Sequence, residues 1–201
     1  MIWMAGFTVI PLLMVFYYGL TDRSGAFTLA NILAIGSSEH LKALWLSLAL
    51  AGVSTVICLL LAYPLALILR KRHIGKGSFV VFIFILPMWM NFLLRTMAWQ
   101  TLLEKNGVIN AFLTILHLPN IAIINTPAAI ILGMVYNFLP FMVLPIYNTL
   151  AKIDDNVINA ARDLGADNYQ TLTKILLPLS VPGIVSGITM VFVPALTTFV
   201  I

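Results

Sequence analysis

The run Ala43–Leu69, with the sequence ALWLSLALAGVSTVICLLLAYPLALIL, decides the class of fold because it contains no Asp, Glu, Lys or Arg. A helix of about 20 predominantly apolar residues crosses a hydrocarbon core about 30 Å thick, and this run is longer than that. The whole chain agrees, since 61% of its 201 residues are hydrophobic and only 9% are charged. A soluble globular domain carries charge on about a quarter of its residues. The sequence therefore predicts an all-α membrane protein and excludes a soluble domain.

Other apolar stretches extend this pattern along the chain. The charge-free segment 106–151 is too long for one span, but its first part is polar and broken, so only its second part should cross. The N-terminal stretch has no basic residues before it and no small-residue cleavage pattern, which disfavours a signal peptide. We therefore predict a single transmembrane domain, residues 1–201, with five spans at about 1–20, 43–69, 78–98, 127–147 and 179–201.

Lysine and arginine residues indicate the orientation of these spans. They are scattered between apolar runs instead of gathered on one surface, which excludes a nucleic-acid-binding protein. If the N-terminus is cytoplasmic, the cytoplasmic loops 70–77 and 148–178 hold seven of the basic residues, and the opposite loops hold three. Cytoplasmic loops carry an excess of Lys and Arg, so we expect a cytoplasmic N-terminus.

The loop 148–178 predicts two short helices. Asp154 is a candidate N-cap, and Gly165 is a candidate C-terminal stop. Apolar or small side chains recur on one helical face, at Ile153, Val157, Ala161 and Leu164. A second helix should open with a capping-box variant, Asp167-Asn168-Tyr169-Gln170, and end at Leu177-Pro178. From these residues alone, a helix lying on lipid headgroups and a helix docking on a partner stay equally open.

The same loop carries a more specific pattern. It contains the run Asn159-Ala160-Ala161-Arg162-Asp163-Leu164-Gly165-Ala166, followed after a spacer by Ile175-Leu176-Leu177-Pro178. These residues closely resemble the EAA motif of ABC-importer permeases, the inner-membrane components of binding-protein-dependent transport systems. In that family the loop is a coupling helix that inserts into a cleft of a cytoplasmic ATPase, and Asn159 stands where the family has Glu. The resemblance implies that this chain couples through Asp154, Val157, Asn159, Ala160, Ala161, Leu164, Gly165 and Ala166.

The resemblance covers nearly the whole chain and implies a location in the bacterial cytoplasmic (inner) membrane. Family members usually have six spans, so we expect this chain to be a truncated form or a fragment that lacks the sixth. The resemblance also implies three protein partners in addition to membrane lipid. They are a cytoplasmic ABC ATPase dimer, a second permease subunit and an extracytoplasmic substrate-binding protein.

A second resemblance concerns the substrate. It lies in the runs Leu86-Pro87-Met88-Trp89, Leu94-Arg95-Thr96-Met97-Ala98-Trp99 and Phe192-Val193-Pro194-Ala195-Leu196. These look like the spermidine/putrescine permeases of the same family, which implies the import of polyamines. Because carboxylates and aromatic faces attract a polycation, the candidate residues of the substrate path are Trp89, Asn91, Trp99 and Glu104. The alternative for each tryptophan is an anchor at the membrane interface.

Residues for enzyme chemistry do not come together in the sequence. The pair Gly75-Lys76 lacks the upstream glycine of a P-loop, so ATP hydrolysis is expected on a separate subunit. The three histidines, His40, His73 and His117, lie in different loops without a carboxylate at ligand spacing, so we expect no metal site. None of the predicted spans has a charged residue at its centre, which disfavours an intramembrane enzyme. We therefore expect no catalytic residues and no cofactor.

Two alternative functions stay open at this point. A permease of the same family for an anion, a sugar or a metal would share the loop, and Arg95 would favour an anion if it faced the path. A docking or regulatory membrane protein would bind the ATPase through the same loop without moving a solute.

Overall fold

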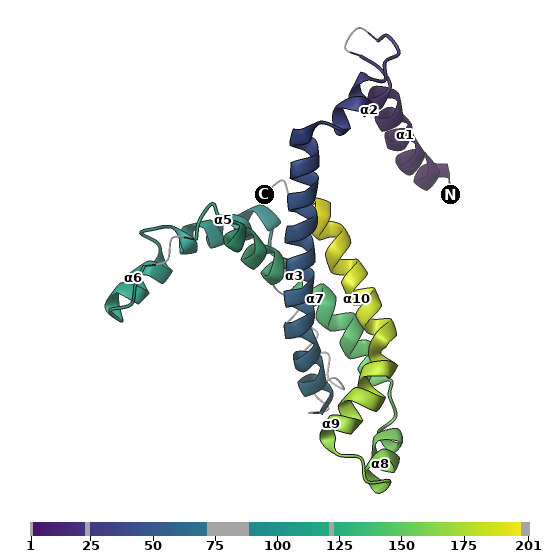
Figure 1. Cartoon of the computed structure of the whole chain (residues 1–201), viewed down its shortest axis with the longest axis vertical. Helices are drawn as coiled ribbons and strands as arrows, with labels where there is room; N and C mark the ends of the chain where they lie inside the picture. The colour runs from purple at the N-terminus through teal and green to yellow at the C-terminus, as the bar shows by residue number, and fades with distance from the viewer. Residues whose placement is uncertain (1, 23–24, 72–88, 121–122, 198–201) are drawn as a thin grey trace. The chain divides into compact units, whose positions relative to one another are not determined.

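The computed structural model describes residues 2–22, 25–71, 89–120 and 123–197, which form helices joined by loops (Figure 1). Within these ranges there is no strand, and the one isolated bridge joins Thr21 and Phe27. The predicted all-helical class is therefore confirmed. Contacts divide the chain into two compact units, Met1–Leu48 and Ala49–Ile201. Each unit is described by itself.

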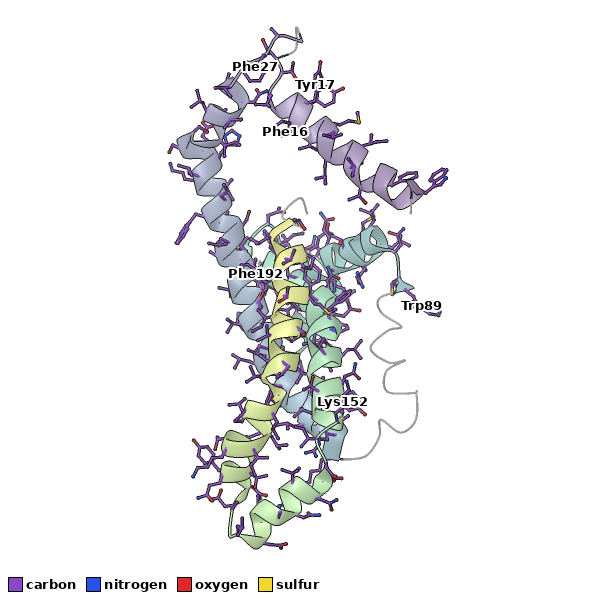
Figure 2. The ribbon with its side chains drawn as sticks, turned by 90° about the vertical axis from the view of Figure 1, so that its right-hand side faces the viewer. Phe16, Tyr17, Phe27, Trp89, Lys152 and Phe192 are labelled. Atoms are coloured by element: carbon purple, nitrogen blue, oxygen red, sulfur yellow. The ribbon has the colours of Figure 1, made fainter. Side chains whose placement is uncertain are left out.

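The first unit contains α1 (Ile2–Gly19), α2 (Ala30–Ile35) and the start of α3 (Ser38–Lys71). The α1 helix is apolar along its length, and its large side chains point outward, as Phe16 and Tyr17 do in Figure 2. A helix that is apolar on all sides is suited to an apolar surrounding such as lipid. The first predicted span, 1–20, thus coincides with one helix.

Three helical segments are long and apolar enough to cross a membrane: Ser38–Lys71, Pro127–Ala151 and Asn168–Thr197. They contain the predicted spans 43–69, 127–147 and 179–201 except for the last few residues of the chain. Much of the predicted span 78–98 lies outside the described residues. A multi-span membrane protein is therefore supported, and the count of five spans stays a prediction.

The predicted end of the second loop helix at Leu177-Pro178 is wrong. Helix α9 (Asn168–Thr171), the π-helical turn η2 (Leu172–Leu176) and α10 (Leu177–Thr197) form one continuous helical segment. The wider π turn bonds the Leu177 N–H to the carbonyl of Leu172. Since a proline has no N–H to give, a local change of hydrogen-bond spacing lets the helix pass through Pro178. The loop therefore runs directly into the last long helix.

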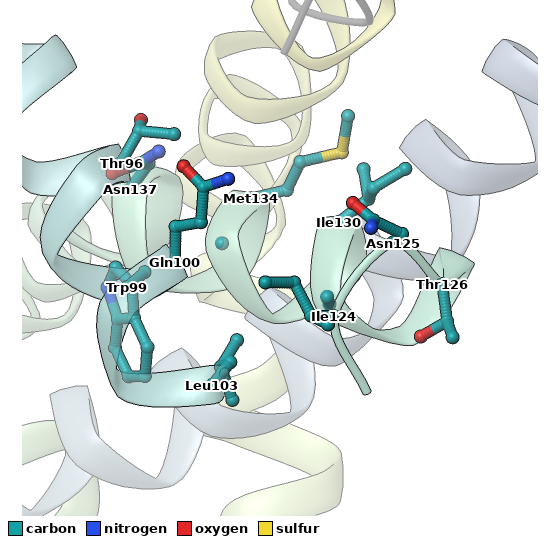
Figure 3. Close-up of a pocket in the computed structure, with 12 residues that line it drawn as sticks. Thr96, Trp99, Gln100, Leu103, Ile124, Asn125, Thr126, Ile130, Met134 and Asn137 are labelled. Carbon is teal, nitrogen blue, oxygen red and sulfur yellow. The ribbon is translucent and has the colours of Figure 1, made fainter. Parts of the chain in front are cut away.

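Helices α5 (Phe92–Leu103) and α6 (Val108–Ile115) are joined by a tight turn. The Asn110 Nδ2 atom holds this turn by donating to the carbonyl oxygens of Glu104 and Lys105. A Cβ atom at Gly107 would lie 2.5 Å from the Thr101 carbonyl oxygen, so only glycine fits there. Helix α5 contacts α7 (Pro127–Ala151), and a pocket opens between these two helices (Figure 3).

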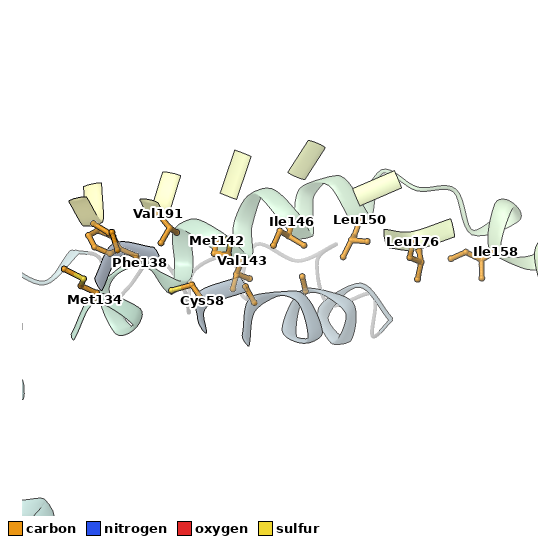
Figure 4. Packing of buried hydrophobic residues seen from close by; sticks show 14 residues of the cluster. Cys58, Met134, Phe138, Met142, Val143, Ile146, Leu150, Ile158, Leu176 and Val191 are labelled. Atoms are coloured by element: carbon orange, nitrogen blue, oxygen red, sulfur yellow. The ribbon is translucent and has the colours of Figure 1, made fainter. Parts of the chain in front are cut away.

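The core of the second unit lies between α3, α7 and α10 (Figure 4). It contains buried side chains from all three helices, including Cys58, Met142, Ile146, Leu150 and Val191. Helices α7 and α10 pack tightly at two glycines of a Gly-x-x-x-Gly sequence, Gly183 and Gly187. A Cβ atom at these positions would lie 2.5 Å from Thr149 Oγ1 and 2.7 Å from Met142 Sδ, respectively. Small residues allow this approach between helix backbones, which is typical of membrane helices.

Candidate functional site

The segment that follows α7 has the local structure that its sequence predicts. The Asp154 carboxylate accepts from the Asn156 N–H at 2.9 Å and caps α8 (Asp155–Asp163). The backbone of Gly165 has φ of +86°, a left-handed conformation that glycine adopts without strain. A capping box between Asp167 and Gln170 then opens α9. The predicted order of helix, glycine turn and helix is confirmed.

The apolar face of α8 is divided between two roles. Ile158, which the sequence analysis did not single out, is 9% exposed and joins the buried cluster near Leu176 (Figure 4). Leu164, in contrast, is 90% exposed. Of the residues predicted to couple, Ala161 and Ala166 are half-buried, and the exposed ones are Asp154, Val157, Asn159, Ala160, Leu164 and Gly165. Ile158 therefore fixes α8 to the helices, while most of the predicted coupling residues stay accessible.

Arg70 joins the end of α3 to the start of α8. Its Nη2 atom donates to the Ile153 carbonyl oxygen at 2.9 Å and to Asp155 Oδ1 at 3.0 Å. In the sequence, Arg70 is only one of the basic residues of the loop 70–77 that indicate orientation. No local pattern could have revealed these contacts, because the partners lie more than eighty residues away in the sequence.

Asn159 lines a cavity of about 650 Å³ between the end of α3 and the segment α8–α9. Three basic residues, Arg70, Lys71 and Arg162, line the same cavity, and Asp155 is the one acidic residue in its described lining. Arg162 Nη2 also lies 3.4 Å from Asn168 Oδ1. The described lining thus holds three basic residues and one acidic residue, and the neutral Asn159, where the EAA pattern has Glu, adds no second carboxylate.

The four predicted path residues are not all brought together. Trp89 is 74% exposed, and Asn91 is the N-cap of α5, where its Oδ1 accepts from the Leu93 N–H at 2.8 Å. Glu104 follows the last residue of α5. Only Trp99 lines the pocket between α5 and α7, which has a volume of about 390 Å³. Its indole ring also packs edge-on against Tyr136, with the ring centroids 5.2 Å apart.

This pocket is built from one stripe on each helix. Helix α5 contributes residues at the spacing of one helical face, which are Thr96, Trp99, Gln100 and Leu103. The facing stripe of α7 has the same spacing at Ile130, Gly133, Met134 and Asn137, and Ala129 of the same helix also lines the pocket. The segment before α7 completes the lining with Ile124, Asn125 and Thr126 (Figure 3). Each stripe has helical spacing in the sequence, but their pairing could not be predicted because the two helices are far apart in the chain.

Asn137 is the unusual polar residue of the pocket. Its side chain is buried, with 8% of the residue exposed, and its Oδ1 atom has no hydrogen-bond partner within the described part of the chain. A buried acceptor without a partner costs about 1–3 kcal/mol. A polar group left in this state is a candidate for contact with a ligand or a partner that supplies a donor.

Comparisons with known proteins agree with the geometry of the loop and the helices. The family model for "Binding-protein-dependent transport system inner membrane component" matches residues 61–201. The spermidine/putrescine transport system permease protein PotB of Haemophilus influenzae is 36% identical over 206 residues, which cover 98% of this chain and 72% of that protein. PotB of Escherichia coli is 37% identical over 205 residues, which cover 98% of this chain and 74% of that protein.

A more distant relative and a solved structure extend the comparison. The inner membrane ABC transporter permease protein YdcU of Escherichia coli is 32% identical and covers 87% of this chain and 60% of its own length. A chain in the crystal structure of a bacterial alginate ABC transporter, in complex with an alginate pentasaccharide-bound periplasmic protein, superposes with a TM-score of 0.67. The match covers 90% of this chain and 68% of that chain at 21% identity, so it concerns the fold alone.

Proposed function

The chain belongs to the family of binding-protein-dependent transport system inner membrane components, and from this premise we propose that it is a permease subunit of an ABC importer that carries polyamines. The observation that carries the proposal is the identity of 36–37% to spermidine/putrescine permeases over 98% of the chain. Similarity of this extent includes the coupling loop, the pocket and the long helices together. The substrate we propose is therefore spermidine or putrescine.

The proposed topology has five spans, a cytoplasmic N-terminus and the loop 148–178 on the cytoplasmic side. Two observations support it. Three helical segments are long and apolar enough to span. In this orientation the cytoplasmic loops also hold most of the basic residues, as the positive-inside rule requires. Arg70 and Lys71 end α3 on that side, and they lie at the cavity beside α8.

The proposed partners are a cytoplasmic ATPase dimer, a second permease subunit and an extracytoplasmic substrate-binding protein. Helix α8 suits the first of these because it exposes Val157, Ala160 and Leu164, which a groove on the ATPase can bury. The small side chain of Ala160 allows close approach, and Gly165 provides the turn that angles α8 away from α9.

Coupling then follows from the connections of α8 to the long helices. Arg70 ties the start of α8 to the end of α3, and α9 continues through η2 into α10 without a break. Closure of the ATPase dimer would displace α8 and so move α3 and α10 as rigid elements. The spans would thereby alternate between outward and inward openings.

The proposed substrate path includes the pocket between α5 and α7. Trp99 lines this pocket, and cation–π attraction to an indole ring is worth about 0.5–1 kcal/mol at exposed sites and about 2 when desolvated. Trp89, Asn91 and Glu104 lie outside this pocket and stay predictions for other parts of the path.

Co-purification with the ATPase tests the coupling part of the proposal. The chain is expressed with its candidate ATPase and second permease, as wild type and as Gly165→Asp and Ala161→Glu. We expect the wild-type complex to form and both variants to lose the ATPase while they still insert into the membrane. Equal recovery of the ATPase with all three chains would show that the loop does not dock.

A further inference from the structure

We infer that the pocket between α5 and α7 binds an ammonium group, and that Asn137 Oδ1 accepts a hydrogen bond from it. The inference deepens the proposed function, on which it rests, because it names the residue and the chemistry that would recognise a polyamine inside the membrane. The sequence analysis did not include Asn137 among the path residues.

The first argument is the exceptional state of Asn137 among the buried polar residues. The other five in the described part of the chain all hydrogen bond within it, and they are Ser54, Thr55, Asn110, Thr171 and Ser180. Asn137 is also buried, with 8% of the residue exposed, but its Oδ1 atom has no partner there. It also lies on the stripe of α7 that lines the pocket (Figure 3). A donor that enters the pocket would complete the hydrogen bonding of this buried oxygen.

The second argument is the charge of the pocket. Its described lining residues carry no charge at neutral pH, and Arg95, on the same helix as Trp99, is not one of them. An anion would therefore meet no cation there. An ammonium group has only donors and fits an acceptor oxygen, and the side-chain carbonyl groups of Gln100 and Asn125 provide further acceptors.

The third argument concerns release. A buried carboxylate would hold a polycation strongly, whereas a path must bind its solute weakly enough to let it leave. A neutral amide oxygen in a pocket that the Trp99 side chain also lines offers this weaker attraction. The combination suits a transient site for an amine and does not suit a storage site.

Direct binding to the assembled complex tests the inference. The chain is purified with its ATPase and second permease but without the binding protein, and Trp3, Trp45 and Trp89 are replaced by Phe so that Trp99 reports for this chain. Tryptophans of the partner subunits are also replaced. Spermidine and putrescine are titrated, together with the diol that has the carbon chain of putrescine and hydroxyl groups in place of the amines.

We expect both amines to change the Trp99 fluorescence with saturation, and the diol to bind much more weakly. Asn137→Leu should weaken amine binding about tenfold or more, because a hydrogen bond to a charged group is lost. Thr189→Val is the matched control, since Thr189 is exposed on α10 and its hydroxyl bonds only to its own helix, at the Val185 carbonyl. Binding curves that are equal for wild type and Asn137→Leu would overturn the inference, as would equal affinity for the diol.

Uptake of radiolabelled spermidine and of radiolabelled putrescine, measured in parallel with the binding protein present, separates the inference from the proposed function. Uptake without amine binding at Trp99 overturns the inference and leaves the proposed function standing. Binding that depends on Asn137, without uptake of either polyamine, supports the inference and overturns the proposed function. If neither amine binding nor polyamine uptake is observed, both the inference and the proposed function are overturned.

Discussion

The Nη2 atom of Arg70, in the last turn of α3, lies 3.0 Å from the Oδ1 atom of Asp155, the first residue of α8. The Arg70 side chain is 13% exposed and the Asp155 side chain is 63% exposed, so the arginine is the more deeply embedded partner. The contact joins a candidate membrane span to the helix that we propose to dock on the ATPase. Movement of α8 would therefore be passed to α3 through a defined ion pair.

We expect Arg70→Ala to reduce the number of spermidine molecules moved per ATP hydrolysed by about fivefold. The reason is that α8 would then move with less effect on α3, and a largely exposed partner limits the ion pair to about 1 kcal/mol. The measurement compares uptake and ATP hydrolysis in the same proteoliposomes. The reversed pair, Arg70→Asp with Asp155→Arg, should recover part of the loss. An unchanged ratio in Arg70→Ala would show that the contact has no part in coupling.

Ile158 of α8 and Leu164, the residue that follows this helix, should separate docking from stability. Leu164→Ser should weaken ATPase binding without lowering the melting temperature of the permease, because Leu164 is 90% exposed. Ile158→Ala should lower the melting temperature, since the loss of a buried isoleucine costs about 2–5 kcal/mol. The two are compared by ATPase pull-down and by thermal unfolding in detergent. A stable permease with Ile158→Ala would contradict the anchoring role of this residue.

Asn159→Glu should make the ATPase complex more resistant to salt. The new carboxylate would face the three basic residues of the cavity and would pair with Arg162 one turn along the helix, worth about 0.2–0.5 kcal/mol. The measurement is the salt concentration at which the ATPase dissociates. Asn156→Glu is the control, because Asn156 lies on the same helix but outside the cavity lining. Dissociation of the ATPase from the Asn159→Glu chain at a lower salt concentration than from wild type would contradict this interpretation of the cavity.

Gly183→Ala should destabilise the helix pair α7 and α10. The added methyl group would lie 2.5 Å from Thr149 Oγ1 and 2.8 Å from the Pro145 carbonyl oxygen, and overpacking of this kind costs about 1–3 kcal/mol. Gly52→Ala is the matched control on α3, where nothing lies within 4 Å of the added atom, and its higher helix propensity should leave stability equal or higher. Thermal unfolding of the two variants gives the comparison, and equal melting temperatures would contradict close packing at Gly183.

The sequence predicted correctly the features that depend on interactions between neighbouring residues. Asp154, Gly165 and the Asp167-Gln170 pair act on backbone atoms within a few residues, so their caps and turn could be inferred without knowledge of the fold. The end of a helix at Pro178 also looked local, but a π turn in the preceding residues removed the conflict. Pro178 therefore marks a local change in helical hydrogen bonding and not the end of the helix.

The contacts that could not be predicted from the sequence join segments that are far apart in the chain. Arg70 meets Asp155 only after α3 and α8 have packed. Asn137 is not among the path residues predicted from the sequence, because nothing in its neighbourhood along the chain shows that α5 lies opposite. Trp99 was selected for its chemistry, and the structure adds the pocket around it. Of the four candidates that chemistry selected, the structure places only Trp99 in this pocket, and Asn137 becomes a candidate only through tertiary packing.

Spermidine uptake by the assembled transporter tests the central claim most directly. Proteoliposomes contain this chain, the second permease and the ATPase, with the binding protein and labelled spermidine on one side and ATP on the other. The account predicts accumulation that requires ATP and is lost in Gly165→Asp while the variant chain remains inserted. Accumulation that is equal in wild type and Gly165→Asp, or no accumulation by the complete wild-type complex, would contradict the account.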